Sequence, residues 1–185
     1  MYSTSDFKRG LRIMYEGSPH SIIEFQHHKP GKGAAIVRTR LRNLLTGNVV
    51  DPTFRSGDKV DRPDLEDKEV QFLYAAEEVY HFMEPASFEQ YEITKDTLGE
   101  ATHFLVDGIT CSVLFYRGKP INIDLPNHVI LTVVECDPAV RGDTVQGATK
   151  PARMQTGYTV QVPLFINEGD NLKIDTRTGE YTERA

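Results

Sequence analysis

Tryptophan is absent from the 185 residues of this chain, and cysteine occurs only twice. Cys111 and Cys136 each lie in an apolar, strand-like run, and neither has a second cysteine at the spacing of a metal site or a redox pair. We expect both thiols to be buried and reduced, as is usual in the cytosol. No apolar run approaches the roughly 20 residues that a bilayer span needs, and the N-terminal residues lack the apolar core of a signal peptide. These absences predict a cytoplasmic protein that binds no membrane.

The short motifs of common enzyme classes are absent as well. Neither Gly-x-Ser-x-Gly nor His-Glu-x-x-His nor a dinucleotide-binding glycine pattern occurs. A phosphate-binding P-loop would need glycine in place of Gln26 and Ser or Thr in place of Gly33, which excludes that class. The adjacent His27 and His28 point to opposite faces of a strand, so they do not suit one metal ion. We expect no catalytic residue, no metal and no cofactor.

The net charge of −6 is unevenly distributed. Residues 1–50 hold eight Lys or Arg against three Asp or Glu, a balance of +5, so residues 51–185 carry −11. A basic segment on an acidic chain indicates that one end meets phosphate and the rest does not.

Short runs of alternating apolar and polar residues, separated by turn signals, predict strands along most of the chain. The expected strands are Ser21 to Phe25, Ala35 to Leu41, Val70 to Tyr74, Val79 to Met83, Ile109 to Tyr116, Val129 to Val134 and Tyr158 to Phe165. One helix is expected from Thr94, a candidate N-cap, to Leu105, with Leu98 and Ala101 on the same face. Many short strands are typical of small barrels, and a single short helix suits a five-stranded barrel of the OB kind.

Two breaks divide the chain into three parts. The charged, proline-containing segment from Asp61 to Glu69 resembles a solvated linker, and Leu125-Pro126-Asn127 separates two predicted strands. We predict domains at residues 1–64, 65–126 and 127–185, each near the lower size limit for a self-supporting core. The predicted fold class is all-β, with three small barrels.

The segment Lys29-Pro30-Gly31-Lys32-Gly33 lies between two predicted strands. Pro30 suits the first corner of a turn, and Gly31 supplies the positive φ that a type II turn needs at the next position. Lys32 is therefore expected at a hairpin apex between two glycines, where its long cationic side chain can reach into a narrow crevice.

The following strand places Arg38, Arg40 and Arg42 on one face, because side chains alternate along a strand. Such a basic stripe suits a phosphate backbone. Exposed arginines on a solvated strand also protect against edge aggregation. The pattern alone leaves both interpretations open.

Three motifs lie in the first and third predicted domains. They are the lysine tip with Ala34 and the basic strand, the third-domain signature Lys150-x-Ala152-x-x-x-x-Gly157-x-x-Val160-x-Val162-Pro163-x-x-Ile166-x-x-Gly169, and the chain end Asp175-Thr176-Arg177-Thr178-Gly179-Glu180-Tyr181 with Arg184. Together these motifs resemble those of bacterial translation elongation factor P. The resemblance covers essentially the whole chain. It implies an L-shaped molecule with an SH3-like (KOW-type) N-terminal barrel followed by two OB barrels.

The resemblance also implies a function. It implies a monomeric, non-enzymatic factor that binds the 70S ribosome between the P and E sites, contacts the P-site peptidyl-tRNA and stimulates peptide-bond formation at consecutive prolines. Lys32 stands at the tip position that family members extend by modification, which requires a lysine-modifying enzyme acting in trans. A cationic arm that steadies the CCA end would lower the entropic cost of the reactive pose.

Further contacts are implied in the third domain. Gly142, Asp143, Thr144 and Gly147 match a loop expected to contact the ribosome or messenger RNA. Ala148 replaces a second glycine of the family loop, so a positive φ there would be strained. Tyr181 and Arg184 are candidate contacts to the tRNA backbone, although these side chains could equally pack and be solvated.

Three alternatives are open. The elongation-factor-P-like paralogue shares the three barrels, but its tip differs from Pro-Gly-Lys-Gly. A generic RNA-binding protein of SH3 and OB barrels would bind many RNAs in a salt-sensitive way. An enzyme with Lys32 as nucleophile would need a pocket that activates the amine, and a glycine-flanked tip suggests full solvation instead.

Overall fold

The computed structural model describes residues 1–138 and 147–185, and its architecture is all-β, as predicted. The chain divides into two compact units, Met1–Glu66 with Phe115–Ile121 and Asp67–Leu114 with Asn122–Ala185. The bounds of the three domains expected from the sequence stay predictions. In the described ranges, no helix has the length and apolar character needed to cross a bilayer.

The N-terminal unit is built on a sheet of order β2-β3-β4-β5, in which β6 also pairs with β4; β1 pairs separately with β7. The elements are β1 (Tyr2–Ser3), η1 (Thr4–Asp6), β2 (Arg12–Tyr15), β3 (Ser18–His28), β4 (Ile36–Asn43), β5 (Val49–Val50), β6 (Thr53–Arg55) and β7 (Lys59–Val60). The core of this unit consists of Phe7, Ile13, Ile22, Val37, Leu41 and Val60. Phe54 packs edge-to-face on Phe7, with ring centroids 5.4 Å apart. Aromatic pairs of this geometry add to the stability that burial alone provides.

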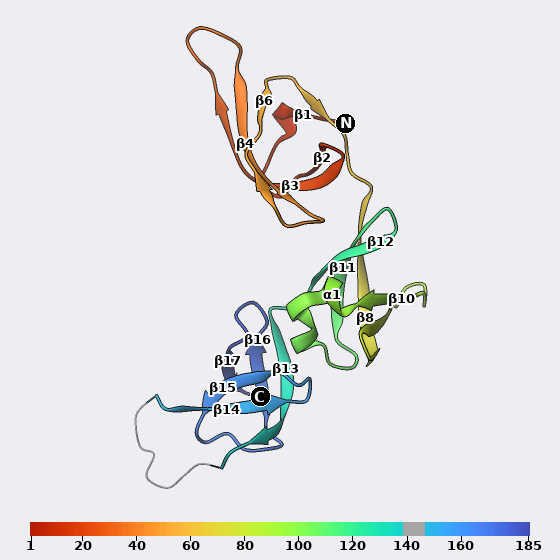
Figure 1. Cartoon of the computed structure of the whole chain (residues 1–185), viewed down its shortest axis with the longest axis vertical. Helices are drawn as coiled ribbons and strands as arrows, with labels where there is room; N and C mark the ends of the chain where they lie inside the picture. The colour runs from red at the N-terminus through yellow and green to blue at the C-terminus, as the bar shows by residue number, and fades with distance from the viewer. Residues whose placement is uncertain (139–146) are drawn as a thin grey trace. The chain divides into compact units, whose positions relative to one another are not determined.

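The hairpin of β3 and β4 is the longest in this unit. Its strands pair antiparallel from His20 and Asn43 to His28 and Ile36, and it extends beyond the other strands of its sheet (Figure 1). Positive φ occurs at Gly33 (+113°) and not at Gly31. The expected type II turn with positive φ at Gly31 is therefore wrong: the left-handed step comes after Lys32, where the chain returns toward β4.

The second five-stranded sheet has the order β10-β9-β8-β11-β12. Its strands are β8 (Leu65–Ala76), β9 (Val79–Met83), β10 (Gln90–Thr94), β11 (Thr110–Tyr116) and β12 (Lys119–Asp124). Val70, Phe72, Phe82 and Ile93 are buried on its inner side. The predicted linker is shorter than expected, because Leu65 to Glu69 form the start of β8 and only 61–64 lie outside strands.

The expected helix from Thr94 to Leu105 is broken into two pieces. Helix α1 (Lys95–Leu98) is followed by the 3-10 helix η2 (Gly99–Phe104), because Gly99 takes φ +56° and ψ −129°, which an α-helix cannot continue. Thr94 is at the N-cap position, but its hydroxyl lies 3.2 Å from the Thr97 hydroxyl and caps no backbone N–H. Leu98 and Leu105 are buried, as the apolar spacing indicated.

The third five-stranded sheet has the order β15-β14-β13-β16-β17. Its strands are β13 (His128–Cys136), β14 (Thr149–Met154), β15 (Thr159–Pro163), β16 (Asn171–Asp175) and β17 (Tyr181–Arg184). When the strands of each sheet are numbered by their order along the chain, the second and third sheets share the spatial order third, second, first, fourth, fifth. In the third sheet β15 also contacts β17, which closes that barrel. This arrangement fits the two OB barrels that were expected.

The core of the third barrel contains a residue from outside its own strands. Phe104 of η2 is buried in a cluster with Leu131, Met154, Val162 and Ile174. Next to it, the Thr156 hydroxyl donates to the His103 carbonyl at 2.7 Å, and the His103 ring lies 4.6 Å from the Tyr158 ring. The 3-10 helix therefore ties the two barrels of the second unit together.

The two cysteines differ in their surroundings. Cys111 is buried, and burial raises the pKa of its thiol to about 12. Cys136 is only half-buried, with its Sγ donating to the Ile166 carbonyl at 3.6 Å. Both thiols were predicted to be buried. The prediction is confirmed for Cys111 and is wrong for Cys136.

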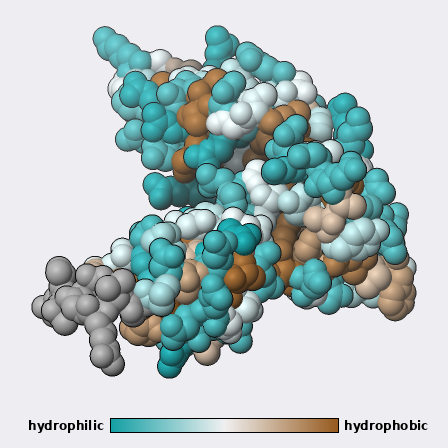
Figure 2. Space-filling view, turned by 60° about the horizontal axis from the view of Figure 1, so that its bottom comes forward, coloured by the Kyte–Doolittle hydropathy of each residue, from teal (hydrophilic) through white to brown (hydrophobic). Residues whose placement is uncertain are grey.

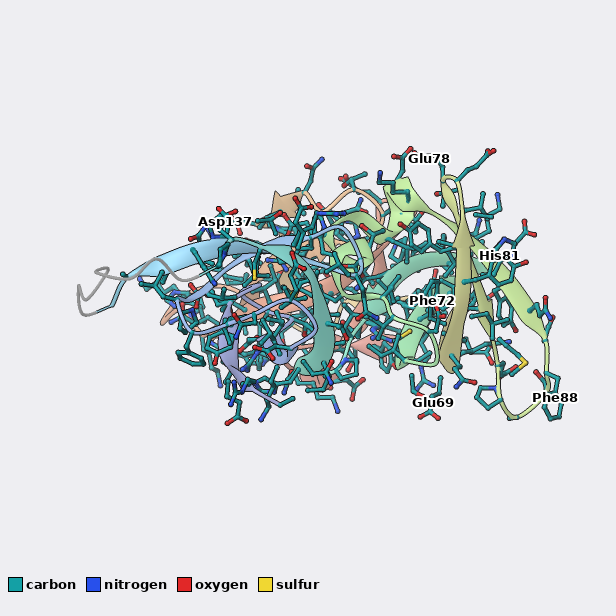
Figure 3. All side chains as sticks on the ribbon, turned by 90° about the horizontal axis from the view of Figure 1, so that it is seen from below. Glu69, Phe72, Glu78, His81, Phe88 and Asp137 are labelled. Atoms are coloured by element: carbon teal, nitrogen blue, oxygen red, sulfur yellow. The ribbon has the colours of Figure 1, made fainter. Side chains whose placement is uncertain are left out.

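Hydrophilic residues cover most of the face seen in Figure 2, and hydrophobic residues occur there in separate patches. Phe88, in the turn between β9 and β10, is the most exposed aromatic side chain of the described residues (73%), and it points away from the strands in Figure 3. Its backbone has φ +60°, a region that non-glycine residues seldom occupy.

Candidate functional site

The tip of the β3–β4 hairpin presents Lys32 to solvent. Lys29, Gly31, Lys32 and Gly33 are exposed, whereas Pro30 is half-buried. A Cβ added at Gly33 would lie 3.8 Å from Pro30 Cγ, so the proline ring packs inside the turn. Within the described ranges, Lys32 forms no ion pair or hydrogen bond. Its ammonium group is available to a partner.

The arginine stripe lies on the outer face of β4, as the alternation predicted. Arg38, Arg40 and Arg42 are exposed, while Val37, Thr39 and Leu41 between them are buried. Arg38 and Arg42 are four residues apart, roughly 13 Å along a strand. The stripe begins two residues into β4, so it leads directly away from the lysine tip.

Arg40 and Arg38 have different neighbours. Arg40 lies opposite Glu24 of β3 in the strand register, and its Nε donates to Asp51 Oδ1 at 3.1 Å. Arg38 lies opposite Gln26 of β3 and Thr53 of β6, which are uncharged. The positive charge of Arg40 is therefore opposed by carboxylates, and that of Arg38 is not.

These residues line a surface groove of about 570 Å³. Its walls come from β3, β4, the loop before β6 and the start of β6, and Arg9 also lines it. The lining residues are Arg9, Glu24, Phe25, Gln26, Arg38, Thr39, Arg40, Asp51 and Thr53. The groove therefore presents guanidinium donors and carboxylate acceptors side by side.

The candidate contacts of the third domain are only partly described. Gly142, Asp143 and Thr144 lie outside the described residues. Gly147 is exposed with φ +83°, whereas Ala148 has no positive φ, so alanine at this position causes no left-handed strain.

Tyr181 and Arg184 lie at the two ends of β17. Tyr181 is half-buried and packs on the third-barrel core, and Arg184 is exposed with its guanidinium 5.9 Å from the Phe165 ring centroid. Packing thus accounts for the Tyr181 ring, and Arg184 keeps its donors at the surface.

Three family models match successive parts of the chain. They describe the elongation factor P KOW-like domain at residues 3–60, the elongation factor P OB domain at residues 65–123 and the elongation factor P C-terminal region at residues 129–184. The chain belongs to the elongation factor P family.

Relatives named elongation factor P match over full length. The protein of Natranaerobius thermophilus is 54% identical over 185 residues, which cover 100% of this chain and 98% of the relative. The protein of Desulfovibrio desulfuricans is 52% identical over 184 residues, covering 100% of both chains. This membership makes the chain a translation elongation factor.

Solved structures support the barrel architecture. Eukaryotic translation initiation factor 5A from Methanococcus jannaschii aligns with a TM-score of 0.57 at 21% identity, covering 67% of this chain and 93% of that chain. A translation initiation factor 5A family protein from Naegleria fowleri gives a TM-score of 0.54 at 16% identity, covering 67% and 96%. At these identities the likeness concerns the fold alone.

The sequence patterns did not predict the acidic side of the groove. Asp51 stands in a loop before Pro52, and Glu24 occupies an ordinary outward position on β3. Their approach to Arg40 depends on the pairing of β3 with β4 and on the path after β5, which alternation along one strand does not reveal. Arg9 contributed to the counted basic excess, but no pattern linked it to the stripe.

Proposed function

We propose that this chain binds the ribosome between the P and E sites, contacts the peptidyl-tRNA and stimulates peptide-bond formation at consecutive prolines. Lys32 would steady the CCA end of the tRNA, and Arg38 and Arg42 would hold backbone phosphates nearer the barrel. The observation that carries the proposal is the exposed, unpaired Lys32 at the tip of a long hairpin with an arginine stripe on its next strand.

The hairpin suits a narrow, negatively charged site. Its tip is only two strands wide, so it can enter a crevice that would exclude the barrel. Proline is a constrained secondary amine, and its attack on the peptidyl ester depends on how both substrates are posed. Restricting the CCA end before the reaction reduces the entropy that the transition state must lose. The ribosome supplies the catalytic groups, and this chain holds the CCA end in position.

The same geometry supports the proposal that Lys32 is modified. The Lys32 side chain is exposed, so an enzyme acting in trans can reach its amine. A longer cationic group attached there would extend the reach of the tip without disturbing the core, to which residues 29–35 contribute nothing.

The test is reconstituted translation of a reporter with consecutive prolines, using protein purified from its own host. Wild-type protein should relieve the stall, Lys32→Ala should not, and Lys29→Ala, which removes an exposed lysine from the same tip, should retain most of the relief. A reporter without prolines should not respond to any of them.

The outcomes separate the competing functions. Equal relief by wild type and Lys32→Ala would keep the elongation-factor role and remove the tip mechanism. Absence of relief by all proteins would favour a generic RNA-binding role, which predicts salt-sensitive binding to unrelated RNAs. A large fall in the melting temperature of Lys32→Ala would contradict the exposed position of this side chain.

A further inference from the structure

The outer face of the N-terminal sheet places six polar side chains in two parallel rows. One row runs from Glu24 of β3 through Arg40 of β4 to Asp51 in the loop before β6. The other row runs from Gln26 of β3 through Arg38 of β4 to Thr53 of β6. The first row carries a net negative charge, because one guanidinium stands between two carboxylates. The second row carries one positive charge among neutral groups.

Two acidic side chains would be unexpected in a surface that only attracts phosphate. Each exposed carboxylate repels a phosphate backbone, so Glu24 and Asp51 oppose the attraction due to Arg38 and Arg42. Carboxylates accept hydrogen bonds and, when ionised, cannot donate them. In a nucleic acid, the sugar hydroxyl next to each phosphate is a donor that RNA possesses and DNA lacks.

From this arrangement, we infer that the groove is a ribonucleotide-binding subsite that distinguishes RNA from DNA. Arg38 and Arg9 hold one backbone phosphate, and Glu24 and Asp51 accept hydrogen bonds from adjacent 2′-hydroxyl groups. This inference rests on the proposed function, because it identifies how the same hairpin recognises the tRNA.

The remaining contacts in the groove fit this division of roles. The Arg40–Asp51 pair leaves the second carboxylate oxygen of Asp51 without a protein donor among the described residues, and 63% of that side chain is exposed. Gln26 and Thr53 flank Arg38 and can bond either to a phosphate or to a sugar. Half of the Arg40 side chain is exposed, so its remaining N–H groups can still reach the ligand.

The experiment measures binding of the full chain to three labelled hairpins of one sequence, each with a single-stranded CCA end. The hairpins are RNA, RNA with 2′-O-methyl groups and DNA, compared at one fixed salt concentration. Wild-type protein should bind RNA about tenfold tighter than either of the others. The methylated RNA keeps the hydroxyl oxygen and loses the donor, so it tests the hydrogen bond without any change in the protein.

The variant Glu24→Ala with Asp51→Ala should bind DNA at least as tightly as wild type, because two negative charges are gone. Its RNA preference should fall to about twofold or less, because alanine offers no acceptor to the 2′-hydroxyl groups. Arg9→Ala should weaken binding to RNA and DNA equally, since it removes a phosphate contact. The matched control is Glu78→Ala with Glu92→Ala, which removes two exposed carboxylates away from the groove, Glu78 in the turn between β8 and β9 and Glu92 on β10, and should leave the preference unchanged.

A double variant with equally raised affinity for RNA and DNA and an unchanged preference would overturn the inference, because the carboxylates would then act only by repulsion. Equal binding of RNA and methylated RNA by wild-type protein would also overturn it. Either result leaves the proposed function intact if wild-type protein relieves proline stalls. Failure of stall relief would instead overturn the proposed function, whichever preference is measured.

Discussion

The hydroxyl of Tyr158 donates to the carbonyl of Gly179 at 3.4 Å, and the glycine backbone lies directly against the tyrosine side chain. A Cβ added at Gly179 would overlap the Tyr158 hydroxyl, and Gly179 also has φ +77°. The Tyr158 ring is held by the rings of His103 and Phe104, so it cannot simply move aside. Glycine is thus required here on two independent grounds.

Gly179→Ala should lower the free energy of unfolding by about 2 kcal/mol or more, because left-handed strain of roughly 1 kcal/mol adds to the steric overlap. Urea denaturation measures the change. Gly169→Ala is the matched control, since Gly169 has φ +86° in the same barrel and no atom near its added Cβ. Equal losses in the two variants would show that Tyr158 is free to adapt.

Phe104→Ala should destabilise the protein by about 3–5 kcal/mol, because it empties a site in the third-barrel core. Phe88→Ala makes the same chemical change at an exposed position and should alter stability by less than about 0.5 kcal/mol. Thermal and urea unfolding of both variants would test the comparison. A small effect of Phe104→Ala would mean that η2 does not tie the two barrels together.

Stability should depend on Asp175 at low pH. The Arg177 guanidinium and backbone N–H both donate to this carboxylate and hold its pKa at about 2. Because the pKa is lower in the folded state than in the unfolded state, the contribution is complete above about pH 4 and is lost as the pH falls toward 2. Asp175→Asn should therefore flatten the plot of unfolding free energy against pH within that window. A plot parallel to that of wild type would contradict the assignment.

The arginines of the stripe should contribute unequally to ribosome binding. Arg38→Ala should weaken co-sedimentation more than Arg40→Ala, because Asp51 already opposes the Arg40 charge. The Arg38 variant should also reduce the salt slope of binding by about one phosphate contact. Arg153→Ala serves as a control, since Arg153 pairs with Glu135 in the third barrel. A larger loss for Arg40→Ala would reverse the proposed roles.

The two thiols should react at very different rates. In native protein at neutral pH, a thiol reagent should modify half-buried Cys136 well before Cys111, whose burial keeps its pKa near 12. Mass spectrometry of partly labelled protein identifies the modified residue. Early labelling of Cys111 would indicate that β11 opens readily.

The alternation of apolar and polar residues correctly predicted features that depend on one strand alone. The bounds of β9 were predicted to the residue, and the outward positions of Arg38, Arg40 and Arg42 were correct, because burial on one face imposes a period of two. What depends on neighbouring segments was missed. The continuous helix failed at Gly99, and the Arg40–Asp51 pair required knowledge of how the chain returns after β5. The wrong glycine was assigned the positive φ at the tip, because several turn types accept the same Pro-Gly sequence.

The separation of the hairpin tip from the core has an evolutionary consequence. No core residue of the N-terminal unit lies between 29 and 35, so selection for folding places little constraint on that segment. Mutations there can change the length or the charge of the tip at little risk to stability. The barrel can therefore stay constant while the tip changes.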